Sequence, residues 1–156
     1  MMKKRLNIYC VWLITACIIA LLSNHWDTAM WCYNLGKGTV SINFDSPWEL
    51  SKIALWALDL NIILFAGILF VIIIRNINNS VVFEWMNIRF FRFTAFALFI
   101  HFILSSATNM VEIWGIQGGI GDPIDYYALV ITLFVLVIAE VFAIGLRLKE
   151  EQELTI

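Results

Sequence analysis

The chain has 156 residues, of which 62% are hydrophobic and 14% charged, and its formal net charge is −2. A small soluble domain leaves a large share of its surface in water and could not hide this much apolar surface. The composition therefore excludes an ordinary soluble domain and predicts an all-α integral membrane protein, with the lipid bilayer as its solvent.

Four apolar segments are long enough, or nearly so, for the roughly 20 residues that a membrane-spanning helix needs. We expect a single four-helix transmembrane domain with spans at about 6–23, 53–74, 93–114 and 126–148. The remaining segments are then an outer loop, an inner loop, an outer Gly-rich loop and a cytoplasmic tail, at 24–52, 75–92, 115–125 and 149–156. Within the first outer loop, residues 39–44 alternate weakly, which allows a short strand or hairpin.

The basic residues are distributed unequally between the two sides of the membrane. If the chain alternates, one side receives only Lys37 and Lys52. The other side receives the remaining eight: Lys3, Lys4, Arg5, Arg75, Arg89, Arg92, Arg147 and Lys149. The positive-inside rule then places both termini in the cytoplasm. The membrane is expected to be the cytoplasmic (inner) membrane of the cell.

Two helix starts can be recognised in the outer loops. Ser46, Pro47 and Glu49 form a capping box with proline at the first helical position, so the second helix is expected to begin at Pro47. Asp122 followed by Pro123 repeats this pattern before the fourth span, and Asp122 is expected to be its cap.

Ionisable side chains within the spans are costly in lipid and are functional candidates by default. Asp59, His101 and Glu140 lie in spans two, three and four. Span three also carries a polar stripe along one helical face: Thr94, His101, Ser105, Thr108 and Glu112. The stripe is interpreted either as interhelical hydrogen bonding or as a pathway for a proton, an ion or a small ligand.

Depth along the helices suggests partners for these groups. Counted from Phe93 and Arg147, His101 and Glu140 both lie roughly 10–12 Å from the inner edge, so a Glu140–His101 contact is one hypothesis. Asp59 lies nearer the outer edge, where Glu112 or Asn109 of span three could meet it.

No cofactor or metal site is expected. A haem held by two histidines needs them at matching depth, whereas His25 lies at the outer boundary and His101 lies deep. A zinc site needs three or four ligands, and no His, Cys, Asp and Glu cluster has suitable spacing. No Ser–His–acid arrangement is evident either, so we expect a protein without enzymatic activity.

The second half of the chain resembles a known family. Residues 83–92 read FEWMNIRFFR, residues 139–142 read AEVF, and residues 148–156 read LKEEQELTI. This is similar to the bacterial membrane proteins grouped as domain of unknown function 2975. Their pattern is a phenylalanine and Asn-Val-Lys-x-Leu-Arg before span three, then Ala-Glu-Val-Phe and a Leu-Lys-Glu-Glu-x-Asp-Leu-Thr-Ile end. This chain departs at Phe90, where the family often adds a basic residue.

The resemblance implies four spans but no established activity. Members are frequently encoded beside a small helix-turn-helix DNA-binding regulator, which implies a cytoplasmic protein partner and no direct nucleic acid binding by the chain itself. The candidate partner-binding residues are Phe83, Asn87, Arg89, Arg92, Glu150, Glu151 and Leu154. The plainer interpretation is that these arginines obey the positive-inside rule, that the aromatic residues lie in the interface, and that the acids are solvated.

Two functions of different classes follow. The leading hypothesis is a regulator or sensor that couples a membrane or extracellular signal to a cytoplasmic partner. The alternative is a small oligomeric transporter or channel that uses Asp59, His101, Glu112 and Glu140. A structural or assembly factor is a third hypothesis, and a homo-oligomer is compatible with each of them.

Overall fold

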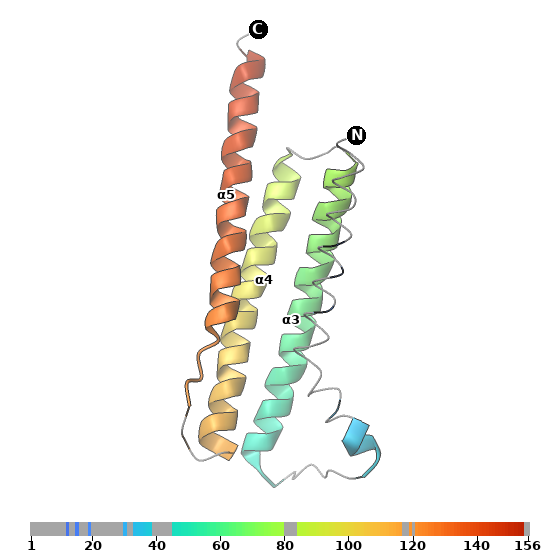
Figure 1. Ribbon diagram of the computed structural model, residues 1–156, viewed down its shortest axis with the longest axis vertical. Coiled ribbons are helices and arrows are strands. Elements are labelled where there is room, and N and C mark those ends of the chain that lie inside the picture. The colour runs from blue at the N-terminus through green and yellow to red at the C-terminus, as the bar shows by residue number, and fades with distance from the viewer. Residues whose placement is uncertain are drawn as a thin grey trace. The chain divides into compact units, whose positions relative to one another are not determined.

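The computed structural model describes residues 12, 15, 19, 30, 33–38, 45–79, 84–116, 119 and 121–154. Most of the first expected span, the expected strand at 39–44, and Phe83 lie outside the described residues. The chain divides into two compact units, residues 1–49 and residues 50–156. Its described residues form helices and contain no strand, which confirms the all-α class (Figure 1).

The first unit contains a short helical turn at 33–36. The Lys37 amide donates to the Tyr33 carbonyl over 3.1 Å, and Gly38 closes the turn with φ of 69°. The Lys37 ammonium lies 4.5 Å from the centre of the Tyr33 ring, so the cation contacts the electron-rich face of the ring.

Helix α3 runs from Pro47 to Asn78. The Glu49 amide donates to the Ser46 hydroxyl over 3.4 Å, so Ser46 caps the helix and Pro47 takes its first position. The expected start at Pro47 is confirmed.

Helix α4 runs from Trp85 to Met110 and continues as a π-helical segment, η1, from Val111 to Ile116. Helix α5 runs from Tyr126 to Leu154. The segment 75–92, expected as a loop, is thus helical at both ends, and most of the expected tail continues α5. A helix keeps its backbone hydrogen bonds in water as well as in lipid, so it need not end where the apolar segment ends.

Within the described residues, three helical stretches are long and apolar enough to cross a membrane: Pro47–Ile77, Trp85–Gly115 and Tyr126–Leu154. They contain the expected second, third and fourth spans. The chain is therefore a membrane protein by the length and composition of its helices.

The start of α5 corrects one expectation. Asp122 does not cap the helix; its carboxylate accepts a hydrogen bond from the Ile124 amide over 3.0 Å, two residues on. Asp125 is the cap, since its Oδ1 accepts from the amide of Ala128, the third residue of α5, over 3.0 Å. The Asp122–Pro123 pair resembles a cap followed by a first helical position, but it forms a turn ahead of the helix.

Small side chains lie where α3, α4 and α5 meet. Ala139 of α5 packs with Ile73 of α3 and Phe91 of α4, and Ala143 of α5 packs with Ile88 of α4. Such residues let helix backbones approach closely, as is usual for helices packed in membranes. Larger apolar side chains face outward in great number along all three helices. This inverted pattern suits a lipid environment.

Candidate functional site

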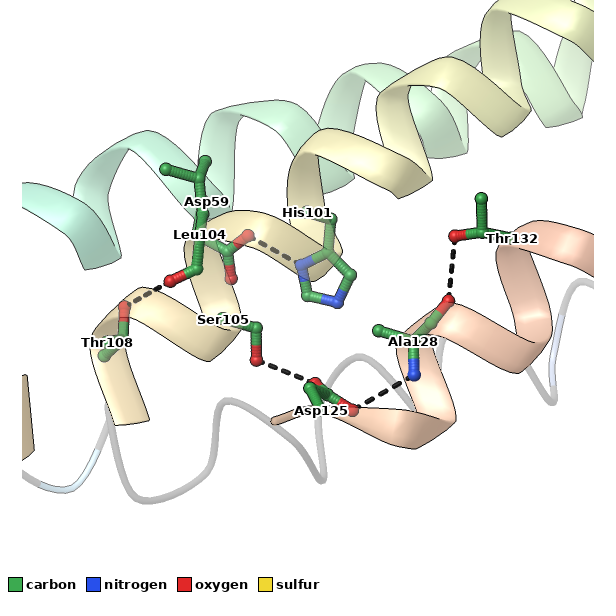
Figure 2. Close-up of polar contacts among 8 residues, drawn as sticks. All are labelled: Asp59, His101, Leu104, Ser105, Thr108, Asp125, Ala128 and Thr132. Atoms are coloured by element: carbon green, nitrogen blue, oxygen red, sulfur yellow. Dashed lines mark hydrogen bonds and ion pairs between the residues drawn. The ribbon is translucent and has the colours of Figure 1, made fainter. Parts of the chain in front are cut away.

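A largely buried polar contact of the second unit joins Asp59 of α3 to His101 of α4. The His101 Nδ1 and Asp59 Oδ1 atoms lie 2.6 Å apart (Figure 2). The Asp59 side chain is 7% exposed and that of His101 is 15% exposed. With a protonated Nδ1, the imidazole donates to the carboxylate in a charge-assisted hydrogen bond. The contact therefore connects α3 and α4 away from water.

The threonines of this region satisfy their hydroxyl groups within their own helices. Thr94 and Thr108 of α4 donate to the carbonyls of Phe90 and Leu104, each over 2.8 Å. Thr132 of α5 does the same to Ala128 (Figure 2). Bonding to the carbonyl four residues earlier lets a buried hydroxyl exist without a partner on another helix. Thr94 and Thr108 therefore donate within α4.

Two serines of α4 hold the first turn of α5. The Ser105 hydroxyl donates to Asp125 Oδ2 over 2.7 Å, and the Ser106 hydroxyl accepts from the Asp125 amide over 3.1 Å. Because Asp125 Oδ1 also caps α5, one carboxylate satisfies the helix start and a neighbouring helix together (Figure 2). The Asn109 amide reaches the Pro123 carbonyl nearby over a longer 3.4 Å.

Glu112 of η1 pairs with Lys52 of α3, with 2.9 Å between Lys52 Nζ and Glu112 Oε2. The expected meeting of Glu112 with Asp59 is therefore wrong, because Asp59 pairs with His101 about two helical turns further along α3. A lysine neutralises Glu112, and no shared proton or cation between two acids is required.

Glu140 pairs with Arg92 instead of His101, which corrects the hypothesis of a Glu140–His101 contact. Arg92 Nε and Nη2 lie 3.1 Å and 2.8 Å from Glu140 Oε1. Counting inward from Phe93 and Arg147 gives His101 and Glu140 equal depths only if Phe93 and Arg147 lie at the same depth. In the structure α5 continues past Arg147 to Leu154, and Glu140 lies at the depth of Arg92.

At the opposite end from Glu112, α4 is joined to both neighbours. Trp85 Nε1 donates to Glu150 Oε1 of α5 over 2.9 Å, and Asn76 Nδ2 of α3 donates to Asn87 Oδ1 over 2.7 Å. Asn87 is fully buried. The end of α5 that carries Glu150 therefore lies beside the start of α4, at the segment expected to bind a partner.

The remaining sequence candidates at this end are exposed: Arg89, Glu151 and Leu154. The structure does not bring them together with the Asp59–His101 pair, which lies far along α4 from Arg89. Sequence reasoning missed several participants in the polar contacts: Lys52, Asn76, Trp85, Ser106 and Asp125. The signal for Asp125 was available, since it lies three residues before Ala128 in an acidic segment preceding an apolar run.

The described residues contain no group of three or more His, Cys, Asp or Glu side chains placed to hold a metal ion. The polar side chains along α4 instead bond to protein groups on α3, α5 or α4 itself. This arrangement can hold the helices in register, and the Asp59–His101 hydrogen bond is one of the contacts that do so.

These observations define a helical membrane protein whose third expected span carries polar contacts to both neighbouring helices. The chain belongs to the family described as "Protein of unknown function (DUF2975)", which matches residues 4–156. The family resemblance seen in the inner segment and the tail is thereby confirmed, and the match extends over almost the full length of the chain. Neither a comparison with curated proteins nor one with solved structures gave a match.

Proposed function

We propose that the chain is a non-enzymatic regulator of the bacterial inner membrane that binds a cytoplasmic protein through the start of α4 and the end of α5. The contact between Trp85 and Glu150 carries this proposal, since it makes one surface from two segments that are 65 residues apart in the sequence. A small helix-turn-helix transcription regulator is the partner that the family resemblance favours.

The distribution of charge supports an orientation with both termini in the cytoplasm. Arg75, Arg89 and Arg147 mark one end of α3, α4 and α5, and Lys52 and Glu112 mark the other. From Lys52 to Arg75, and from Glu112 to Arg89, each helix rises about 35 Å, slightly more than the roughly 30 Å hydrocarbon core. The arginine end is then the cytoplasmic end by the positive-inside rule.

A route for a signal follows from α4, which is bonded near both ends. Ser105 and Ser106 hold the outer end of α5, and Trp85 holds its inner end. A displacement of the outer end of α4 would therefore change the Trp85–Glu150 contact at its inner end. A signal can only shift an equilibrium between packings that it binds unequally, and loss of the Asp59–His101 pair would remove one of the contacts that hold α4 to α3.

The transporter alternative receives less support. Its four groups all have a charged or ionisable partner within the second unit: Asp59 with His101, Glu112 with Lys52, and Glu140 with Arg92. Paired groups at three separate levels suit the locking of helices better than a connected path.

The test is co-expression of the chain with the product of a neighbouring helix-turn-helix gene, followed by measurement of the regulator that sediments with membranes. We expect the wild type to retain it, and the Glu150→Gln and Trp85→Phe variants to retain severalfold less. The matched control is Glu153→Gln, which removes an exposed acid of the same turn that forms an ion pair with Lys149, 3.7 Å away on α5 itself. Regulator that stays soluble with the wild type, or equal retention by all variants, would overturn the proposal.

A further inference from the structure

The ion pair between Arg92 and Glu140 lies on the exposed surface of α4 and α5, at a membrane depth where lipid is expected around the helices. The Arg92 and Glu140 side chains are 47% and 58% exposed. Counted from Arg89 on α4 and from Arg147 on α5, the pair lies about 5–10 Å inside the arginine-marked end. Charged groups inside the apolar part of a membrane are costly unless protein surrounds them.

Within the part of the chain that the structure describes, the pair also leaves hydrogen-bonding capacity unused. Both guanidinium nitrogens that reach Glu140 donate to the same oxygen, Oε1. Among the described residues, no group bonds to Glu140 Oε2 or to Arg92 Nη1. An unsatisfied carboxylate oxygen in an apolar environment is a strong reason to expect a further donor.

The apolar residues of α4 beside the pair continue in a regular stripe. Phe96, Phe99 and Ile103 follow Arg92 at intervals of four, three and four residues, and all three are exposed. These intervals average about 3.7 residues, close to the 3.6-residue period of the α-helix, so the four side chains lie along one face of α4.

The same spacing occurs on α5. Four exposed residues follow one another there at intervals of four, three and four: Leu133, Val137, Glu140 and Ile144. Because Arg92 contacts Glu140, the two stripes run side by side on one face of the helix pair. We name this face, with Arg92 and Glu140 near its inner end, the α4–α5 face.

We propose that the α4–α5 face binds a second copy of the chain, around a two-fold axis parallel to the helices. In this arrangement α4 of each copy packs against α5 of the other. Arg92 of each copy then donates to the free carboxylate oxygen of Glu140 in the other, which closes a ring of four alternating charges. The proposal concerns assembly and does not depend on the regulatory function.

Charge complementarity selects a second copy as the occupant. The face presents one base and one acid at a single depth, so its partner must present one acid and one base at that depth. A second copy inserted in the same orientation does so by symmetry, since every residue then meets the same level of the membrane. The expected first span, 6–23, contains no Asp, Glu, Lys or Arg and cannot supply these groups.

The first experiment measures association of donor- and acceptor-labelled full-length chains by energy transfer in phosphatidylcholine–phosphatidylglycerol vesicles, over a range of protein-to-lipid ratios. We expect the wild type to dimerise and the R92Q/E140Q double variant to associate at least about tenfold more weakly. The matched control is K52Q/E112Q, which also neutralises an ion pair between two helices, but away from the α4–α5 face. Circular dichroism establishes that each variant keeps its helices.

A charge exchange then tests the symmetry directly. Chains with R92E carry two acids on the face, and chains with E140R carry two bases. We expect each variant alone to be monomeric and the two together to form a mixed dimer, recovered through one tag and detected through the other. The equivalent K52E and E112K chains should show no such preference for one another. A wild-type chain that stays monomeric at every ratio would overturn the proposal, as would R92E and E140R chains that fail to associate.

Discussion

Nδ1 of His101 lies 2.6 Å from Oδ1 of Asp59, and both side chains are largely shielded from water. The two residues come from α4 and α3, so their contact fixes how these helices are placed along one another. Both side chains are largely buried, so the contact stabilises the packing of α4 against α3.

Replacement of either residue by leucine, Asp59→Leu or His101→Leu, is expected to lower the free energy of unfolding by about 1–3 kcal/mol, because the remaining partner loses a charge-assisted hydrogen bond. The D59L/H101L double variant should lose less than the sum of the single losses, since no unsatisfied group remains. Denaturation in detergent micelles, followed by circular dichroism, measures these values. Strictly additive losses would mean that the two side chains act independently.

The sequence identified Asp59 and His101 as costly residues, but it did not pair them. The free-energy cost of placing a side chain in lipid depends on the residue type and on its position within an apolar segment. Both can be read directly from the sequence. Pairing depends on how far α4 and α5 slide past their neighbours, which is set by packing around residues such as Ala139 and Phe91. A slide of one turn changes every partner, and Arg92, the observed partner of Glu140, lies nine residues or about two and a half turns from the expected His101.

The cap of α5 provides a second test. Asp125→Ala removes the helix cap and the partner of Ser105 together and should lower the free energy of unfolding by about 1–2 kcal/mol. Asp122→Ala removes a turn hydrogen bond and a side-chain hydrogen bond with Tyr126, both on the surface, and should cost less, about 0.5 kcal/mol. The same denaturation experiment compares the two variants. A larger loss for Asp122→Ala would contradict the assignment of Asp125 as the cap.

The hydrogen bond between Trp85 and Glu150 is expected to order the last two turns of α5. Trp85→Phe keeps an aromatic ring but removes the N–H donor, and Glu150→Gln weakens the acceptor. Amide hydrogen exchange in residues 148–154 should become severalfold faster in both variants and stay unchanged in the middle of α5. Glu153→Gln serves as the control, because Glu153 forms an ion pair with Lys149 of the same helix. Unchanged exchange in all variants would show that the tail is helical without help from α4.

The fold was easier to predict than the contacts. Apolar segments of about 20 residues, together with the capping box at Ser46 and Pro47, were sufficient to place α3, α4 and α5. The ends of the helices were not predictable in this way. Polar residues of good helix propensity, such as Lys149 to Glu153, continue a helix into water as readily as they form a tail.

The orientation of the chain can be tested with single cysteines in a background where Cys10, Cys17 and Cys32 are serine. Tyr127 at the start of α5 and Leu154 at its end are 86% and 87% exposed, so differences in labelling report sidedness more than burial. Arg75, Arg89 and Arg147 lie toward the Leu154 end, which the positive-inside rule places in the cytoplasm. A membrane-impermeant maleimide should therefore label Tyr127→Cys in intact spheroplasts, and Leu154→Cys only after the membrane is permeabilised. The reverse pattern would place the tail outside and would remove the Trp85–Glu150 surface from any cytoplasmic partner.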